Sequence, residues 1–367
     1  MTSAYIIAAC RTAVAPRGGA FAALEPHALA APVITEALQQ AGLAPERVDE
    51  VIVSNALGMG GNPARSVALA SGLSTRVAGL SIDRQCAGGM DAVLIARQMI
   101  LSGTAKVVIA GGVESYSRRP LRSRTFADGR PAQPYEQAPF TPWPDRDPDM
   151  AVAAAQLGKT LGISRAEQDK WAIASHAKAR ASTFPPNEIV PLKGLEHDPF
   201  ARELTPALCT RAKSLSGDVT SANTAVAADA AAFCIVVSED IALEAGLTAV
   251  RIVEGATLGG DPVCPGIAPV AAVKHVLAQA GLTPSDINHA EVMEAFAVQA
   301  IACIEGTGIH PDTVNKGGGA LARGHPIGAS GAINTVRLVH DLRRNSGIGL
   351  ATIAAAGGIA TALVLSA

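Results

Sequence analysis

The chain has 367 residues, of which 49% are apolar and only 3% aromatic, and its formal net charge is −2. This length exceeds the size at which one hydrophobic core usually stops growing, so we expect two or three domains. The small net charge gives no reason to expect a polyanionic partner, no nucleic-acid-binding motif is found, and no run of about 18 apolar residues predicts a membrane span.

Short apolar runs alternate with helical patterns in the first third of the chain, which is typical of an α/β protein. A proline- and arginine-rich segment then predicts an irregular insertion, followed by a long helical stretch in which Ser164 and Glu167 form a capping box. The α/β pattern returns afterwards. The predicted strands are 5–9, 51–54, 107–110 and 230–237, the helices 27–41, 89–102 and 150–182, and the insertion 118–148.

Six cysteines are scattered along the chain, at Cys10, Cys86, Cys209, Cys234, Cys264 and Cys303. None forms a C-x-x-C pair, which argues against both a zinc site and a disulfide scaffold. The N-terminus has no basic region ahead of an apolar stretch, so no signal peptide is predicted. We therefore expect no metal and a cytoplasmic location. Apart from Cys86, we expect the cysteines to be buried apolar residues.

An internal repeat relates two halves of the chain. Residues 39–53 match residues 278–292 at an offset of 239, and both stretches predict a helix end, a glycine cap, a proline-led turn and a strand. The same offset carries Cys86 onto His325. A third similarity relates 107–112 to 353–358 at an offset of 246. Two similar halves thus each present one reactive residue.

Cys86 lies where a short extended run ends and a glycine-rich helix begins, within residues 81–92. The free N–H groups and positive end of a helix favour a thiolate there. His325 lies in a second glycine-rich helix entry, residues 324–331, and imidazole is the usual acceptor of a proton from such a thiol. We expect His176, His197 and His289 to be surface residues and Glu294 to be a structural carboxylate.

The motifs around these residues resemble those of the thiolase family over nearly the full length of the chain. They are Arg84-Gln-Cys86-Ala, Gly111-Gly-Val-Glu-Ser115 and Gly324-His-Pro-Ile-Gly-Ala-Ser-Gly331. The resemblance implies a five-layered α-β-α-β-α sandwich of two repeated halves with an inserted loop domain. We assign 1–117 with 220–244 to the half that carries the nucleophile, 118–219 to the loop domain, and 245–367 to the C-terminal half.

The resemblance also implies that a thioester acylates Cys86, and that His325 activates this cysteine and helps to bind thioester oxygens. In the family a second cysteine deprotonates the α-carbon of an acetyl group, but the aligned residue here is Ala354. Lacking a positioned base forgoes roughly 10²–10⁴-fold in rate. The next glycines, Gly357 and Gly358, either permit tight packing or also offer a backbone N–H to an oxyanion.

Other departures affect substrate binding. Met293 replaces an asparagine that in the family holds an oxyanion-hole water, and losing such a donor typically costs about 10²–10³ in rate. Among the candidate substrate-binding residues, Asn223 is kept, Ala225 replaces a serine that contacts coenzyme A, and Met150 follows Asp149 instead of histidine. The substrate is then a coenzyme A ester held differently, or an acyl carrier protein presents it. The basic segment 118–124 either contacts a phosphate or an acidic carrier helix, or is a solvated loop.

Three functions remain open. The first is thiolase chemistry on an acyl-CoA or 3-ketoacyl-CoA, the second is acyl transfer to an acceptor that is already nucleophilic, and the third is a non-catalytic binding subunit. We favour an acyltransferase with a cysteinyl acyl-enzyme, no bound cofactor and coenzyme A thioester as substrate. We expect a homodimer through the strand before Cys86, 79–83, although a tetramer is also compatible with the family.

Overall fold

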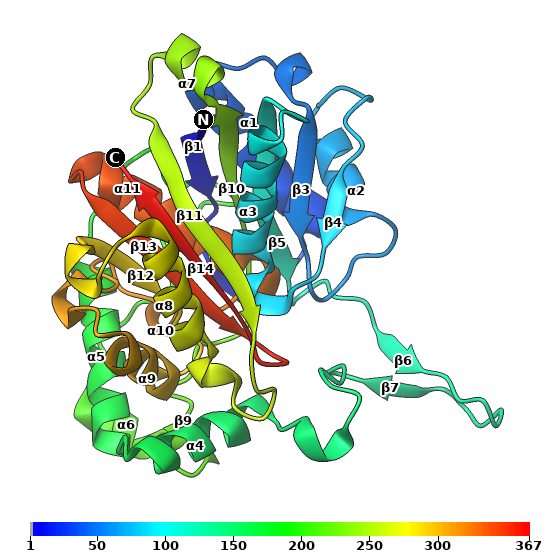
Figure 1. Ribbon diagram of the computed structural model, residues 1–367. Coiled ribbons are helices and arrows are strands. Elements are labelled where there is room, and N and C mark those ends of the chain that lie inside the picture. The colour runs from blue at the N-terminus through cyan, green and yellow to red at the C-terminus, as the bar shows by residue number, and fades with distance from the viewer. Residues whose placement is uncertain (1–2) are drawn as a thin grey trace.

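The computed structural model describes residues 3–367. Ten of its strands form one continuous sheet, in which each half of the chain contributes one side (Figure 1). The first half contributes β1 (Ala4–Arg11), β10 (Ala228–Ser238), β5 (Val107–Ser115), β3 (Glu50–Ser54) and β4 (Leu80–Ile82), with the short β2 (Ala15–Pro16) beside β10. The second contributes β11 (Val250–Gly259), β14 (Ile359–Ser366), β13 (Ile348–Ala355) and β12 (His289–Val292). A short antiparallel pairing of β1 with β11 joins the two sides.

Helices cover both outer faces and fill the space between the two sides. The central helices α3 (Gly88–Leu101) and α11 (Ile327–Arg344) contact strands of both halves, α1 (Pro26–Ala41) and α2 (Pro63–Ala70) cover the first half, and α8 (Ala268–Ala280) with α9 (Ala297–Thr307) covers the second. Separate apolar cores fill the central layer and the two outer interfaces. The predicted five-layered α/β sandwich is confirmed.

The main repeat predicted from the sequence is also present in the structure. Helix α1 ends at Gly42 with φ of 64° and leads to β3, just as α8 ends at Gly281 with φ of 67° and leads to β12. The third similarity was aligned in the wrong register. Val51 pairs with Ile109, and its repeat mate Ala290 pairs with Leu350, which gives an offset of 241 instead of 246. Residues 353–358 therefore run past the end of β13 into the following turn.

Glycines let the two central helices approach closely. A Cβ on Gly89 of α3 would lie 2.7 Å from the backbone nitrogen of Ala332, and one on Gly331 of α11 would lie 2.7 Å from that of Met90. Since a real Cβ does not tolerate such distances, side chains at either position would push the helices apart. This contact brings the N-terminal ends of α3 and α11 together, and with them Cys86 and His325.

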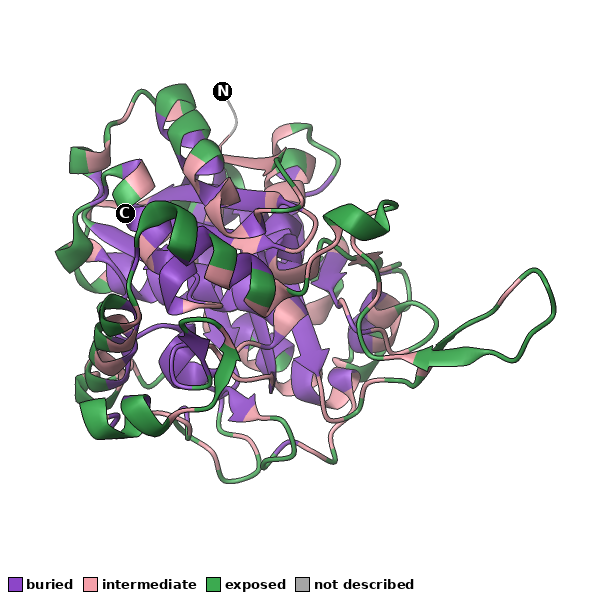
Figure 2. Cartoon of the chain, turned by 90° about the horizontal axis from the view of Figure 1, so that it is seen from below, coloured by how far each residue is buried: buried purple, intermediate pink, exposed green. Residues whose placement is uncertain are grey.

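The segment between β5 and β10 departs from layered structure, as predicted. It starts with a hairpin of β6 (Arg122–Arg124) and β7 (Gln133–Tyr135) that projects away from the body of the molecule and is largely exposed (Figure 2). The predicted long helix is two helices, because Gly162 ends the first with φ of 72° and the Ser164 capping box starts the second. The segment contains α4 (Met150–Leu161), α5 (Arg165–Ala181), α6 (Pro206–Arg211), β8 (Ser214–Ser216) and β9 (Val219–Thr220). Two short helices elsewhere are α7 (Glu239–Ala245) and α10 (Ala320–Arg323).

Two of the histidines expected at the surface are buried. His176 packs against Phe200 and its Nδ1 accepts a hydrogen bond from the backbone of Arg202, while His289 lies in β12 near Lys316. Burial lowers the pKa of both imidazoles, to about 4 for His176, so both are neutral at neutral pH. His197 is exposed, as expected.

Candidate active site

A cavity of about 440 Å³ lies where the N-terminal ends of α3 and α11 meet the inserted segment. Its wall includes five of the predicted site residues, Cys86, His325, Ala354, Met150 and Ala225. These residues come from both halves and from the insertion. The cavity is therefore a candidate active site.

The backbone places Cys86 at the start of α3 through a constrained turn. Gln85, the residue before it, has a φ of 50°, which residues other than glycine rarely adopt. Asp83 supports this conformation by accepting hydrogen bonds from the backbone N–H of Gln85 at 2.8 Å and from its Nε2 at 2.9 Å. A strained turn held by its surroundings is a common feature of functional sites.

Cys86 and His325 are in contact. The Cys86 Sγ lies 3.2 Å from His325 Nε2, and the other ring nitrogen, Nδ1, lies 2.7 Å from Ser330 Oγ. Because Ser330 Oγ donates its own proton to the carbonyl oxygen of Pro326, its oxygen accepts the Nδ1 proton. This assignment leaves the Nε2 lone pair directed at the thiol, as a general base requires.

Burial controls the protonation of this pair. It raises the pKa of Cys86 to about 12, although the backbone N–H groups of Cys86 itself and of Ala356 act in the opposite direction. Burial also lowers the pKa of His325 to about 4. At neutral pH the pair is therefore a thiol and a neutral imidazole. The helix end does favour the anion, as the sequence suggested, but desolvation is the larger effect.

Glu114 connects the two halves of the site. Its carboxylate accepts hydrogen bonds from Asn55 Nδ2 at 2.7 Å, from the backbone of Ala56 at 3.0 Å, and from the backbone of Gly328 at 2.9 Å. It thereby ties the loop after β3 to the first turn of α11. Burial raises the pKa of Glu114 to about 7. This carboxylate fixes the position of the helix that follows His325.

The turn after β13 contributes a residue that sequence reasoning missed. The backbone N–H of Ala356 is directed at the Cys86 sulfur, and Ala354, Ala355 and Ala356 all line the cavity. Gly357 and Gly358 instead have φ of 81° and 80° and form the turn into β14, outside the cavity wall. Ala356 directly precedes the two glycines. The glycine pair in the sequence therefore indicated where the turn lies, but not which residue directs its N–H at the sulfur.

Two other predicted site residues lie behind the wall. Met293 is buried in the central apolar core. Asn223 is buried with its amide nitrogen donating to Asp169 and Asp218 and its oxygen accepting from the backbone of Thr220. Both positions support the loops behind the cavity.

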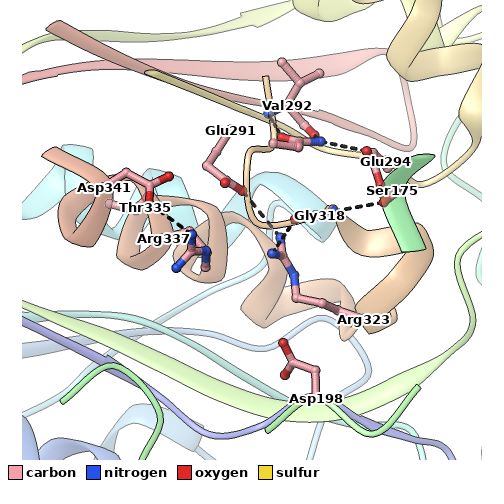
Figure 3. A network of polar contacts seen from close by, with 12 residues as sticks. Ser175, Asp198, Glu291, Val292, Glu294, Gly318, Arg323, Thr335, Arg337 and Asp341 are labelled. Carbon is pink, nitrogen blue, oxygen red and sulfur yellow. Dashed lines mark hydrogen bonds and ion pairs between the residues drawn. The ribbon is translucent and has the colours of Figure 1, made fainter. Parts of the chain in front are cut away.

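Glu294 is bound on several sides, as expected for a structural carboxylate (Figure 3). It accepts hydrogen bonds from Ser175 Oγ at 2.7 Å, Asn315 Nδ2 at 2.8 Å and Trp171 Nε1 at 3.1 Å. These contacts tie the loop after β12 to α5 of the inserted segment. Since Ala295 and Phe296 of that loop line the cavity, the network fixes one of its walls.

Two buried polar groups on the wall have no hydrogen-bond partner among residues 3–367. They are the hydroxyl of Thr224 and the side-chain amide of Gln299 on α9. Burying such groups without partners is costly. Thr224 adjoins Ala225, the residue that replaces a serine of the family. A hydroxyl is therefore present one position before the one that the family uses.

The basic segment 118–124 is largely engaged within the chain. Arg118 pairs with Glu25 at 2.7 Å, and Arg119 pairs with Glu136. The Nη2 of Arg122 donates to the backbone oxygen of Glu136 at 2.6 Å. These contacts give no support to a free basic surface for a carrier protein.

Residues 3–367 offer neither a metal-binding cluster nor a helix that could span a membrane. No group of three or more histidine, cysteine, aspartate or glutamate side chains is arranged to hold a metal ion there. None of the helices in that range is both long and apolar enough to cross a membrane.

Comparisons with known proteins agree with the geometry. The family model described as "Thiolase, N-terminal domain" matches residues 4–240, and that described as "Thiolase, C-terminal domain" matches residues 247–367. YhfS of Bacillus subtilis is 38% identical, over 99% of this chain and 98% of that protein. An acetyl-CoA acetyltransferase of Cupriavidus necator is 37% identical, over 100% of this chain and 99% of that protein. The crystal structure of the Bacillus anthracis acetyl-CoA acetyltransferase superimposes with a TM-score of 0.92 at 33% identity, over 100% of this chain and 99% of that one. The chain belongs to the thiolase family of acyltransferases.

Proposed function

We propose that Cys86 takes an acyl group from a coenzyme A thioester to form a cysteinyl acyl-enzyme. The observation that carries this proposal is the 3.2 Å contact between Cys86 Sγ and His325 Nε2, the ring nitrogen that the hydrogen bond to Ser330 assigns as unprotonated. His325 accepts the thiol proton while the sulfur attacks the thioester carbonyl carbon. The bond from carbon to the coenzyme A sulfur then breaks, and His325 returns the proton to that sulfur.

Backbone donors stabilise the negative charge that develops on the carbonyl oxygen. The N–H groups of Cys86 and Ala356 both point toward the reacting sulfur. Fixed backbone dipoles of this kind act strongly in a buried site. We therefore assign the oxyanion hole to Cys86 and Ala356 in place of Gly357 and Gly358.

The coenzyme A arm enters past the inserted segment. Met150, Ala225 and Phe296 supply apolar surface to the cavity wall. The unpaired hydroxyl of Thr224 and amide of Gln299 match the two amide groups of a pantetheine arm in chemistry. These residues take over the contacts that Ala225 has lost. The unpaired state of all six cysteines fits a reducing cytoplasm.

Intact-protein mass spectrometry tests the acyl-enzyme. The protein is incubated with acetyl-CoA, acetoacetyl-CoA and a longer 3-ketoacyl-CoA. We expect a single acyl adduct of the transferred group, which peptide mapping assigns to Cys86. No adduct from any of these esters would rule out a coenzyme A donor and redirect attention to a carrier protein or to a binding function.

The rate of acylation should be almost independent of pH across the neutral range. Only neutral His325 accepts the thiol proton, and its pKa of about 4 keeps it neutral down to acidic pH. The rate should fall tenfold per pH unit below about pH 4 and show no rise until the solution approaches the Cys86 pKa of about 12. Single-turnover acylation from pH 5 to 9, with circular dichroism as the control for folding, measures this. A step in rate between pH 6 and 8 would instead indicate a thiolate–imidazolium pair.

The second half of the reaction lacks the family's cysteine base, because Ala354 is in the cavity wall. Transfer of the acyl group to an acceptor that is already nucleophilic, such as an amine, a thiol or an electron-rich ring carbon, needs no such base. Because the methyl group of Ala354 cannot accept a proton, we favour this transfer to a nucleophilic acceptor over formation of a carbon–carbon bond with a second acetyl group.

Ala354→Cys should restore part of that missing step. The new thiol would lie in the wall beside Cys86, and a positioned base typically contributes 10²–10⁴-fold. We expect a gain of roughly 10- to 100-fold in acetoacetyl-CoA thiolysis, because Met293 still replaces the asparagine. Ala354→Ser is the matched control and should give no gain. Equal thiolysis by both variants and the parent would mean that the pocket is shaped for another acceptor.

We also propose a homodimer formed along β4. This strand is the edge of the sheet path, and Leu80 within it is an exposed large apolar side chain. An uncovered edge strand is a template for pairing with another chain. We expect a solution mass of twice 37.2 kDa by light scattering, reduced by Leu80→Lys. A monomer, or a dimer unchanged by Leu80→Lys, would refute this interface.

A further inference from the structure

One wall of the cavity carries a largely buried cation, Arg119. Only 15% of its side chain is exposed, against 80% for its ion-pair partner Glu136. Burial lowers the pKa of Arg119, and the positive charge of Arg17 lowers it further. A guanidinium removed from water gains most from a carboxylate that is also removed from water and can accept two hydrogen bonds.

Arg119 lines the same cavity as the nucleophile, Cys86. Its Cζ is 5.8 Å from the centre of the Tyr116 ring. Tyr116 lines the same cavity as Cys86, and both burial and the neighbouring Cys86 raise the pKa of its phenol, so this ring lies near Arg119 and near the nucleophile. The phosphates of coenzyme A are separated from the thioester sulfur by the whole pantetheine arm. An anion that reaches Arg119 from a bound thioester therefore belongs to the acyl chain.

Glu136 is a replaceable partner. Its backbone oxygen accepts from Arg122 at 2.6 Å, which holds the loop after β7, but its carboxylate remains exposed. Exposed ion pairs contribute little, because both water and ions compete for the charges. Asp83, the other carboxylate on the wall, is exposed and already bonded to Gln85. The carboxylates of the wall thus stay in water, while the guanidinium does not.

We propose that this pocket selects acyl groups that end in a carboxylate, with the Arg119 guanidinium as the group that determines this specificity. The substrate class is thioesters of dicarboxylic acids. This inference rests on the acyl-enzyme function proposed above, because the bound thioester is what brings the carboxylate to Arg119. When the substrate binds, its carboxylate replaces that of Glu136, which returns to water.

The test compares glutaryl and pentanoyl thioesters, which differ by a carboxylate in place of the terminal methyl group. Each acyl group is supplied both on coenzyme A and on N-acetylcysteamine, which carries no phosphate. We expect acylation of Cys86 in the parent protein to be about 10- to 100-fold faster in kcat/KM with glutaryl than with pentanoyl on either carrier.

Three variants examine the origin of that preference. Arg119→Leu should abolish it, mainly by slowing the glutaryl donors. Glu136→Gln, an exposed change that leaves the fold intact, should increase it by removing the competing carboxylate. Arg130→Leu is the matched control, because Arg130 lies in the loop of the β6–β7 hairpin and outside the cavity wall. This variant should leave the preference for glutaryl unchanged.

The outcomes separate this inference from the proposed function. Equal rates for the two acyl groups in the parent, or an undiminished preference in Arg119→Leu, would overturn the inference alone. If Arg119→Leu slows both coenzyme A esters but neither N-acetylcysteamine ester, the guanidinium binds a phosphate and the assignment is wrong. If no ester acylates Cys86, calorimetric binding of the two coenzyme A esters to Cys86→Ser still decides the selectivity. A preference for glutaryl there supports the inference, and equal affinity overturns it.

Discussion

Replacing Cys86 by serine should abolish acylation of the protein by any thioester. The serine hydroxyl is far less acidic than a thiol, and the neutral imidazole of His325, with a pKa of about 4, is too weak a base to activate it. Mass spectrometry after incubation with the best donor should show an adduct on the parent protein and none on Cys86→Ser. The expected loss exceeds what any other single substitution would produce.

Cys264→Ser is the matched control, since this cysteine is also partly buried and has a raised pKa caused by burial. It should be acylated as fast as the parent. An adduct of equal yield on Cys86→Ser would place the covalent chemistry at another residue and refute the proposed mechanism.

Replacing His325 by alanine should slow acylation by roughly 10²–10⁴-fold. With a Cys86 pKa of about 12, few thiolates exist at neutral pH, so the reaction depends on proton removal by the base at 3.2 Å. The rate that remains should rise tenfold per pH unit, because hydroxide would then generate the thiolate. This pH dependence contrasts with the flat profile expected for the parent.

Single-turnover acylation from pH 6 to 9 measures both effects, and His197→Ala, at an exposed position, is the control. Ser330→Ala adds a check of the hydrogen-bond chain, since it removes the acceptor of the Nδ1 proton and leaves Cys86 untouched. A His325→Ala protein that keeps the parental rate at neutral pH would show that another group activates the sulfur.

Several parts of the fold were predictable because local patterns encode them. The glycine caps at Gly42 and Gly281 need left-handed backbone, and the repeat of these caps with their following strands indicated two similar halves. The Ser164 capping box marked a helix start correctly. The alignment of 107–112 with 353–358 was wrong because it matched two pairs of glycines that have different structural roles. Gly111 and Gly112 lie inside a strand, whereas Gly357 and Gly358 form a turn.

The sequence by itself indicated the α/β class through its alternating patterns and the five-layered sandwich through its resemblance to the thiolase family. The helix-entry glycines and the 239-residue offset predicted that Cys86 and His325 meet, as they do in the structure. It also showed that Ala354 provides no base. The tertiary structure alone decided the charge state of the pair, since desolvation depends on everything packed around it. It also decided that the backbone N–H of Ala356 faces the Cys86 sulfur and that Arg119 is buried beside Tyr116. These depend on contacts between segments far apart in the chain, and no local pattern records such contacts.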